Sequence, residues 1–226
     1  MTRTEFDNEI QIAREQILQL GAMVEKAMAR SVLALKENDL EASRDILAYD
    51  QRINEKRFEI ESRAITAIAR QQPVAHDLRL LASIIDLCTE LERIGDYAKG
   101  IAVINLRSGG LGLPKLMDDL FHMSKKALDM FQRALDAFVR EDTASARIIA
   151  EEDDLIDALY EQVYNEVIDV VTEDPAKIDR GNYVLWAAHN LERMADRVTN
   201  VCERTVFLST GELGMLSDTL EHRERH

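Results

Sequence analysis

Proline, glycine, cysteine and aromatic residues are all scarce in this chain of 226 residues, which has 3 Pro, 9 Gly, 2 Cys and 5% aromatic residues. Few helix breakers and few bulky rings favour long α-helices over strands and turns. Cys88 and Cys202 lie in apolar helical patterns without a CxxC or Cys/His spacing, which excludes a disulfide framework and a zinc finger. We expect both to be small buried residues in a reducing cytoplasm.

Long apolar runs and positive charge are lacking as well. No apolar run approaches the ~18 residues of a membrane span, and the stretch "MTRTEFDNEI" has no apolar segment like that of a signal peptide. We therefore expect a cytoplasmic protein that reaches a membrane only through its partners. The net charge of −14 disfavours nucleic acid and anionic lipid as partners, and it favours cations or basic protein surfaces.

Motifs for catalysis are also missing. The sequence has no GxxxxGK[ST] phosphate loop and no recognisable Ser-His-Asp arrangement. A ferritin-like di-iron centre needs Glu-x-x-His, whereas none of the 5 histidines has a Glu three residues before it. His189 precedes Glu192 in the reverse order. We expect no enzymatic activity, and we expect core packing to account for Trp186.

Helix breakers divide the chain into six segments. "KEND" (36–39) and "RED" (140–142) are typical of tight turns, and Pro73, Pro114 and Pro175 stand where a proline begins a helix. The predicted helices cover residues 4–37, 40–71, 74–107, 114–140, 142–173 and 176–209. The glycine-rich stretch "RSGGLGLP" (107–114) separates a first domain, 1–108, from a second, 113–210, and residues 211–226 form a solvated tail.

The two halves repeat each other. Asp39 corresponds to Asp142 at an offset of 103 residues, and apolar positions spaced three and four apart follow similar offsets. In the first and fourth helices these positions are Ile10, Ala13, Ile17, Leu20, Val24, Met28, Ser31 and Leu35, and Leu113, Leu116, Leu120, Met123, Ala127, Phe131, Ala134 and Phe138. In the third and sixth they are Ile84, Cys88, Leu91, Ile94, Ala98 and Ile101, and Val184, Ala188, Leu191, Met194, Val198 and Val201. We infer an internal duplication and an all-α fold of two tandem three-helix bundles, with six long antiparallel helices.

Oxygen-bearing side chains four residues apart recur in both halves, and this spacing places both members of a pair on one helix face. In the third and sixth helices the pairs are Glu92 with Asp96, and Glu192 with Asp196. In the second and fifth helices they are Asp50 with Asn54, and Asp153 with Asp157. Adjacent antiparallel helices would bring the two pairs of each half face to face.

Two interpretations of these pairs are open from the pattern alone. Converging carboxylates raise one another's pKa unless a cation lies between them, and iron, zinc, manganese or magnesium would accept their oxygens as ligands. Acidic pairs are also common on solvated helix faces, where Arg93 and Arg193 would pair with acids of a neighbouring helix.

The doubled motif L-E-R-x-x-D, with "QPVAHDLR" (72–79) before its first copy, resembles the PhoU family over residues 4 to 210. The resemblance implies an accessory protein that restrains phosphate uptake and phosphate-starvation signalling when phosphate is plentiful. It implies two partners, the ATPase subunit of the phosphate ABC transporter and a sensor histidine kinase. It also implies a homodimer.

The same resemblance implies metal ions, because such motifs bind metal clusters in some members of the family. The implied ligands are Asp50, Asn54, Glu92 and Asp96 in the first half, and Asp153, Asp157, Glu192 and Asp196 in the second. The family often adds an Asn four residues after the Asp of the motif, which Asn200 provides and Gly100 does not. Two other hypotheses stay open: a carboxylate-bridged catalytic metal centre, and a structural scaffold whose acids are only solvated.

Overall fold

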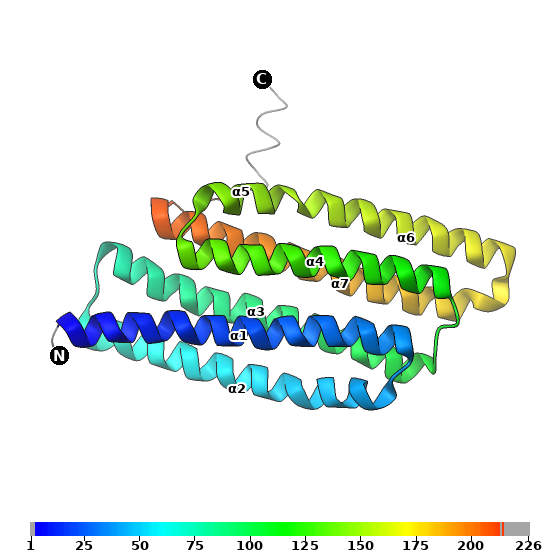
Figure 1. The fold of residues 1–226 in the computed structure, drawn as a ribbon, viewed down its shortest axis with the longest axis horizontal. Coiled ribbons are helices and arrows are strands. Elements are labelled where there is room, and N and C mark those ends of the chain that lie inside the picture. Colours follow the sequence, from blue (N-terminus) through cyan, green and yellow to red (C-terminus); the bar gives the residue numbers. More distant parts are fainter. Residues whose placement is uncertain (1–2, 213, 215–226) are drawn as a thin grey trace, which may run out of the picture.

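The computed structural model describes residues 3–212 and 214, and this part of the chain contains helices and no strands (Figure 1). The helices are α1 (Arg3–Glu37), α2 (Leu40–Gln71), α3 (Ala75–Ser108), α4 (Pro114–Arg140), α5 (Thr143–Glu151), α6 (Asp153–Glu173) and α7 (Ile178–Thr210), with a 3₁₀ turn, η1 (Pro175–Lys177), before α7. The predicted all-α fold of two tandem three-helix bundles is confirmed. Most of the predicted tail, 211–226, lies outside the described residues.

The apolar positions predicted from the repeat form the core. All of them are buried except Ile10, which is partly buried and packs against the core. Both predicted buried cysteines, Cys88 and Cys202, are 0% exposed and free. The prediction for Trp186 is wrong: this side chain is 54% exposed and packs edge-on against Tyr183 at the surface. Helical spacing alone does not show that a ring lies toward the neighbouring helices.

The turn after the first helix has the same construction in both halves. Asn38 and Glu141, 103 residues apart, both have a positive φ that ends the helix. The following residue, Asp39 or Asp142, caps the next helix with its side chain, which accepts a hydrogen bond from a backbone N–H of the first turn. The predicted tight turns at 36–39 and 140–142 are therefore present, and they repeat residue for residue.

The predicted fifth helix, 142–173, is not continuous. It bends at Glu152, where N–H of Glu152 donates to the carbonyl of Ile149 at 3.1 Å, a three-residue step instead of the four of an α-helix. Arg133 of α4 donates to both carboxylate oxygens of Glu152, one of them at 2.8 Å. Tyr49 occupies the equivalent position of α2, which has no such acidic group and runs straight through.

The two bundles pack side by side through antiparallel pairs of equivalent helices, α3 with α7 and α1 with α4 (Figure 1). Across α3 and α7, Asn200 donates to Glu90 at 2.9 Å, and a Cβ added to Gly100 would lie 2.6 Å from Oδ1 of Asn190. At an offset of 100, Glu90 corresponds to Asn190 and Gly100 to Asn200. Exchanging the two halves therefore turns each of these contacts into the other. The halves are therefore related by an approximate two-fold axis, and one continuous core runs through both.

The shared core has a close approach of α1 and α4 at its centre. A Cβ added to Gly21 would lie 2.5 Å from Cδ1 of Leu135, so the missing side chain brings these helices together. Because the core crosses from one half to the other, the domain limits 1–108 and 113–210 stay a prediction from the repeat. No helix among the described residues is long and apolar enough to cross a membrane.

Truncating Leu91 or Leu191 to alanine should lower the free energy of unfolding by about 2–5 kcal/mol. Both leucines are at most 1% exposed within the core, so each truncation leaves a cavity. Urea denaturation followed by circular dichroism measures the loss, and Leu18→Ala, at a side chain 41% exposed on α1, is the control. Two core variants as stable as this control would contradict the core described above.

Candidate functional site

The predicted acidic residues lie where the second and third helices of each half pack together. In the first half this is the groove between α2 and α3, and in the second half the groove between α6 and α7. Asp50 lies across the first groove from Glu92 and Asp96, and the amide of Asn54 binds Asp50 on the same helix. Asp153 and Asp157 face Glu192 and Asp196 across the second, close enough for their charges to act on one another. The structure thus brings together all eight predicted residues, four in each groove.

In the first groove a lysine lies among the predicted ligands. The ammonium of Lys99 donates to Oδ2 of Asp50 at 2.8 Å and to Oδ1 of Asp96 at 3.2 Å. Asp50 is only 5% exposed, and the amide of Asn54 donates to its backbone carbonyl at 3.1 Å. These bonds raise the pKa of Lys99, mainly through the hydrogen bond to Asp50, so the lysine carries a full charge. Lys99 therefore ties α2 to α3 as a cation.

An arginine compensates the remaining acid of the first groove. Nη1 of Arg57 lies 3.5 Å from Oε2 of Glu92, and Nε of Arg57 donates to Glu61 at 2.8 Å. Burial and the neighbouring Asp96 raise the pKa of Glu92, while Arg57 lowers it. Each predicted carboxylate of the first half thus has a cation from the chain itself, although Oδ1 of Asp50 is buried without a hydrogen bond.

The second groove lacks both of these cations. The residue equivalent to Lys99 is Thr199, whose hydroxyl donates to the backbone carbonyl of Asp196 at 2.7 Å. The residue equivalent to Arg57 is Tyr160, whose ring lies 6.3 Å from that of His189. Asn54 is replaced by the acidic Asp157. Four carboxylates therefore share the second groove without a lysine between them.

The pKa values of these carboxylates reflect the missing counter-charge. Burial, followed by repulsion from Asp196, Asp157 and Glu192, raises the pKa of Asp153 to about 7. Burial and Asp196 also raise the pKa of Asp157 and that of Glu192. Oδ1 of Asp153 is buried and accepts no hydrogen bond, and Oε2 of Glu192, also buried, has only the imidazole of His189 near it at 3.2 Å. A cation in this groove would relieve the repulsion and give the buried oxygen of Asp153 a partner.

Two basic side chains touch the second groove from its own helix α7. Nη1 of Arg193 lies 2.5 Å from Oδ2 of Asp196, three residues along the helix. Nδ1 of His189, whose side chain is 59% exposed, lies 3.2 Å from Oε2 of Glu192. His189 touches α6 only through the ring of Tyr160, and neither side chain forms an ion pair with an α6 carboxylate in the described contacts, so neither ties the two helices together as Lys99 does in the first half.

The two grooves differ in how well they fit a metal ion. Among residues 3–212 and 214, no group of three or more Asp, Glu, His or Cys side chains is placed so that it could hold a metal ion as it stands. The first groove does not fit an ion, because Lys99 already holds Asp50 and Asp96. The second groove fits by its donor types alone, since it offers four carboxylates, three of them with raised pKa values, and a buried oxygen of Asp153 without a partner.

Sequence reasoning missed the residues that distinguish the grooves. Lys99 and Arg57 reach across from one helix to another, which a spacing rule within one helix does not detect. The repeat carried the signal, because aligning the halves pairs Lys99 with Thr199 and Arg57 with Tyr160. Asn200, which fits the family motif, lies instead between α3 and α7 and binds Glu90.

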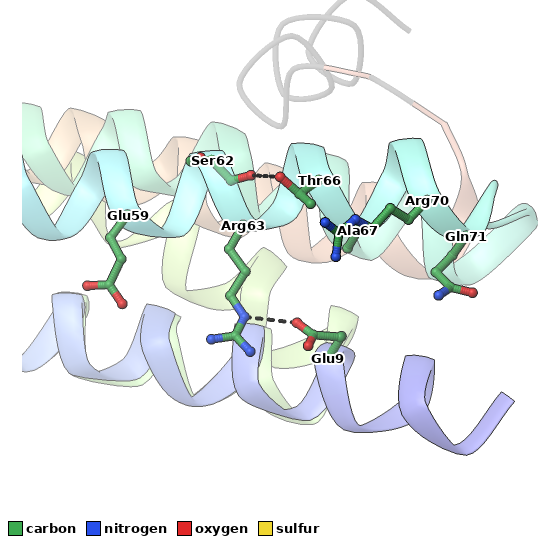
Figure 2. A pocket seen from close by; sticks show the side chains of 8 residues that line it. All are labelled: Glu9, Glu59, Ser62, Arg63, Thr66, Ala67, Arg70 and Gln71. Atoms are coloured by element: carbon green, nitrogen blue, oxygen red, sulfur yellow. Dashed lines mark hydrogen bonds and ion pairs between the residues drawn. The ribbon is translucent and has the colours of Figure 1, made fainter. Parts of the chain in front are cut away.

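A separate groove lies between the first turns of α1 and the end of α2 (Figure 2). It encloses about 450 Å³ and is lined by Glu9, Glu59, Ser62, Arg63, Thr66, Ala67, Arg70 and Gln71. Arg63 donates to Glu9 at 2.9 Å across it. None of the predicted site residues lines this groove.

Comparisons with known proteins match almost the entire chain. The family profile described as "PhoU domain" matches residues 17–104 and again residues 120–205. A phosphate-specific transport system accessory protein PhoU homolog of Clostridium acetobutylicum is 34% identical, over 96% of this chain and 100% of the relative. A homolog of the same name from Streptococcus pneumoniae is 35% identical, over 93% of this chain and 98% of the relative.

Two crystal structures share the fold. PhoU from Pseudomonas aeruginosa has a TM-score of 0.86 and 33% identity, covering 92% of this chain and 100% of that chain. The phosphate transport system regulatory protein PhoU from Streptococcus pneumoniae has a TM-score of 0.84 and 34% identity, covering 92% of this chain and 99% of that chain. The fold and its paired acidic grooves define a class of proteins that contain two copies of one three-helix unit. The chain belongs to the PhoU family.

The same substitution at equivalent positions should change stability in opposite directions. At pH 8 with a chelator present, Asp50→Asn should lower the free energy of unfolding by about 1–3 kcal/mol, because Lys99 loses a buried partner. Asp153→Asn should raise it by about 1–2 kcal/mol, because it removes a repelled carboxylate. The second value is well below the free energy that corresponds to the full pKa shift of Asp153, since solvent reaches part of this side chain.

The effect of Asp153→Asn should shrink as the pH falls from 8 to 5. The folded-state pKa of Asp153, about 7, lies above its unfolded value of 3.8, so the native state binds the extra proton between these values and loses stability as the pH rises. Urea unfolding at pH 5 and pH 8 tests this. The gain should be clearly larger at pH 8 than at pH 5, and a gain of the same size at both pH values would contradict the charge repulsion.

Proposed function

We propose that this protein is a cytoplasmic regulatory adaptor that restrains phosphate uptake and phosphate-starvation signalling when phosphate is plentiful. It would act by binding the ATPase subunit of the phosphate ABC transporter and a sensor histidine kinase, and it would work as a homodimer. The single observation that carries the proposal is the match over almost the whole chain to relatives named phosphate-specific transport system accessory proteins. The second solved relative is named a regulatory protein of the same system.

No chemical step is required of an adaptor, because a partner's equilibrium shifts when one of its states is bound more tightly than the other. Exposed apolar side chains beside an acidic groove support such a role. Ile65 and Leu78, which are 56% and 41% exposed, lie beyond the first groove toward the α2–α3 turn. Their equivalents Ile168 and Ile178, 46% and 53% exposed, lie beyond the second groove toward the α6–α7 turn.

The two pairs lie at opposite ends of the molecule, because the α2–α3 turn and the α6–α7 turn do (Figure 1). We assign each pair, which we call a docking patch, to contact with the transporter's ATPase subunit. Exposed isoleucines and leucine at equivalent positions of two repeats supply apolar contacts, and the carboxylates of the adjacent grooves supply a negative rim. The surface that fits them is apolar with a basic border, because charge complementarity of this kind speeds and orients association.

The metal ions implied by the family are proposed for the second groove alone. Asp153, Asp157, Glu192 and Asp196 would hold a divalent cation such as magnesium, manganese, iron or zinc, and Asp196 would exchange its contact with Arg193 for it. The bound ion would supply positive charge that ties α6 to α7, and no catalysis. Because the pKa of Asp153 is about 7, the affinity of the second groove for the ion should rise as the pH increases through 7.

Deleting the gene should raise phosphate accumulation and alkaline phosphatase output in phosphate-rich medium, because the restraint on uptake and signalling is lost. Intracellular phosphate and phosphatase activity are measured in the parent, the deletion strain and a complemented strain. Parental values of both in the deletion strain would overturn the regulatory proposal.

Replacing an apolar side chain in both docking patches should weaken binding to the purified ATPase subunit at least 10-fold. The double variant Ile65→Glu/Ile168→Glu places a charge at the equivalent point of each half, where it opposes apolar contact. Calorimetric titration gives the affinity, and Leu33→Glu, at a side chain 42% exposed on α1, is the matched control. Unchanged affinity in the double variant would place the partner elsewhere.

A further inference from the structure

We infer that Lys99 takes the position of the metal ion in the first groove, so that the two halves are not equivalent and only the second binds a cation. The inference rests on the metal binding proposed above for the second groove. It departs from the expectation that both copies of the motif act alike, and three features of the structure support it.

The first feature is the bridging geometry of Lys99. Its ammonium bonds a carboxylate on α2 and another on α3, Asp50 at 2.8 Å and Asp96 at 3.2 Å. A divalent ion shared by the two helices would have to bind these same two carboxylates, beside the positive charge of the ammonium. Lys99 is attached to the chain, so its charge is present at every metal concentration, and it supplies the donors that a buried aspartate needs.

The second feature is that Arg57 serves the remaining acid. It lies 3.5 Å from Glu92 and 2.8 Å from Glu61, and its pKa is raised, chiefly by the hydrogen bond to Glu61. Asn54 contributes a neutral amide where the second half has a fourth carboxylate. A metal ion entering the first groove would therefore meet two fixed cations and fewer anionic ligands.

The third feature is that the second groove lacks the equivalent cations on both helices. Thr199 on α7 occupies the position equivalent to Lys99, and Tyr160 on α6 occupies the position equivalent to Arg57. Both replacements are neutral, and they face an additional carboxylate, Asp157. Changes on two separate helices thus alter the charge of one groove in the same direction. The first half has a permanent clamp between its helices, and the second has a clamp that depends on a bound ion.

Titration of the full chain with manganese tests the inference. The protein is stripped with chelator, dialysed at pH 8, and titrated with MnCl₂ by calorimetry, and the metal content is confirmed by elemental analysis. Wild-type protein should bind Mn²⁺ in one groove only. Asp153→Asn should weaken that binding at least 10-fold, whereas Asp50→Asn should leave it unchanged.

Exchanging the two equivalent residues should move the metal site. Thr199→Lys should weaken Mn²⁺ binding at least 10-fold, and Lys99→Thr should add a second binding event that disappears again in Lys99→Thr/Asp50→Asn. Lys99→Arg, which keeps the charge, should add none. Circular dichroism and thermal denaturation establish that each variant is folded, and Thr199→Lys tests the role of the ammonium even if Lys99→Thr fails to fold.

The outcomes separate the inference from the proposal on which it rests. No Mn²⁺ binding by the wild-type chain would overturn the metal function of the second groove. Wild-type binding that is weakened by Asp50→Asn would show that the first groove takes an ion beside Lys99, and would overturn the inference alone. Folded Lys99→Thr without a second event, or Thr199→Lys with wild-type affinity, would overturn it as well.

Discussion

The antiparallel packing of α3 against α7 is the contact on which the rest of this molecule depends. These are equivalent helices of the two repeats, and their contact sets the approximate two-fold axis that also pairs α1 with α4. It lets one core run through both halves, so neither bundle has to bury its apolar faces alone. It also places the two acidic grooves on either side of the pair, one toward α2 and the other toward α6.

Counter-charge explains why equivalent grooves have become different. A carboxylate between packed helices loses much of its hydration, and it needs either a cation or a proton. In the first groove Lys99 and Arg57 provide cations, and Asp50 is buried with its charge compensated. In the second groove Asp153 has no such partner, so its pKa rises to about 7. The same fold thus produces a fixed ionic clamp in one half and an electrostatically strained cluster in the other.

Much of the fold could be predicted from the sequence because it depends on contacts that repeat along one helix. Apolar spacing identified the core, and the turns at Asp39 and Asp142 follow from local capping chemistry. The bend at Glu152 could not be found this way, since Arg133, on a different helix, holds it in place. The eight acidic and amide positions were predicted, but the roles of Lys99 and Thr199 required knowing which side chains meet across a groove. Trp186 shows the same limit, because its spacing fits a core position while its ring is exposed.

The two-fold relation between the halves has a consequence for the origin of the molecule. A lone three-helix unit with this outer surface would leave its α1 and α3 contacts uncovered, and a second copy of itself is the surface that fits them. The present chain has the arrangement of such a homodimer joined covalently by the short glycine-containing connection at 109–113. Covalent joining keeps the effective concentration of one unit near the other high, so assembly no longer depends on how much protein the cell makes. Two identical chains must carry the same residues, whereas two repeats within one chain need not. Each three-helix unit is therefore free to acquire residues that the other unit lacks.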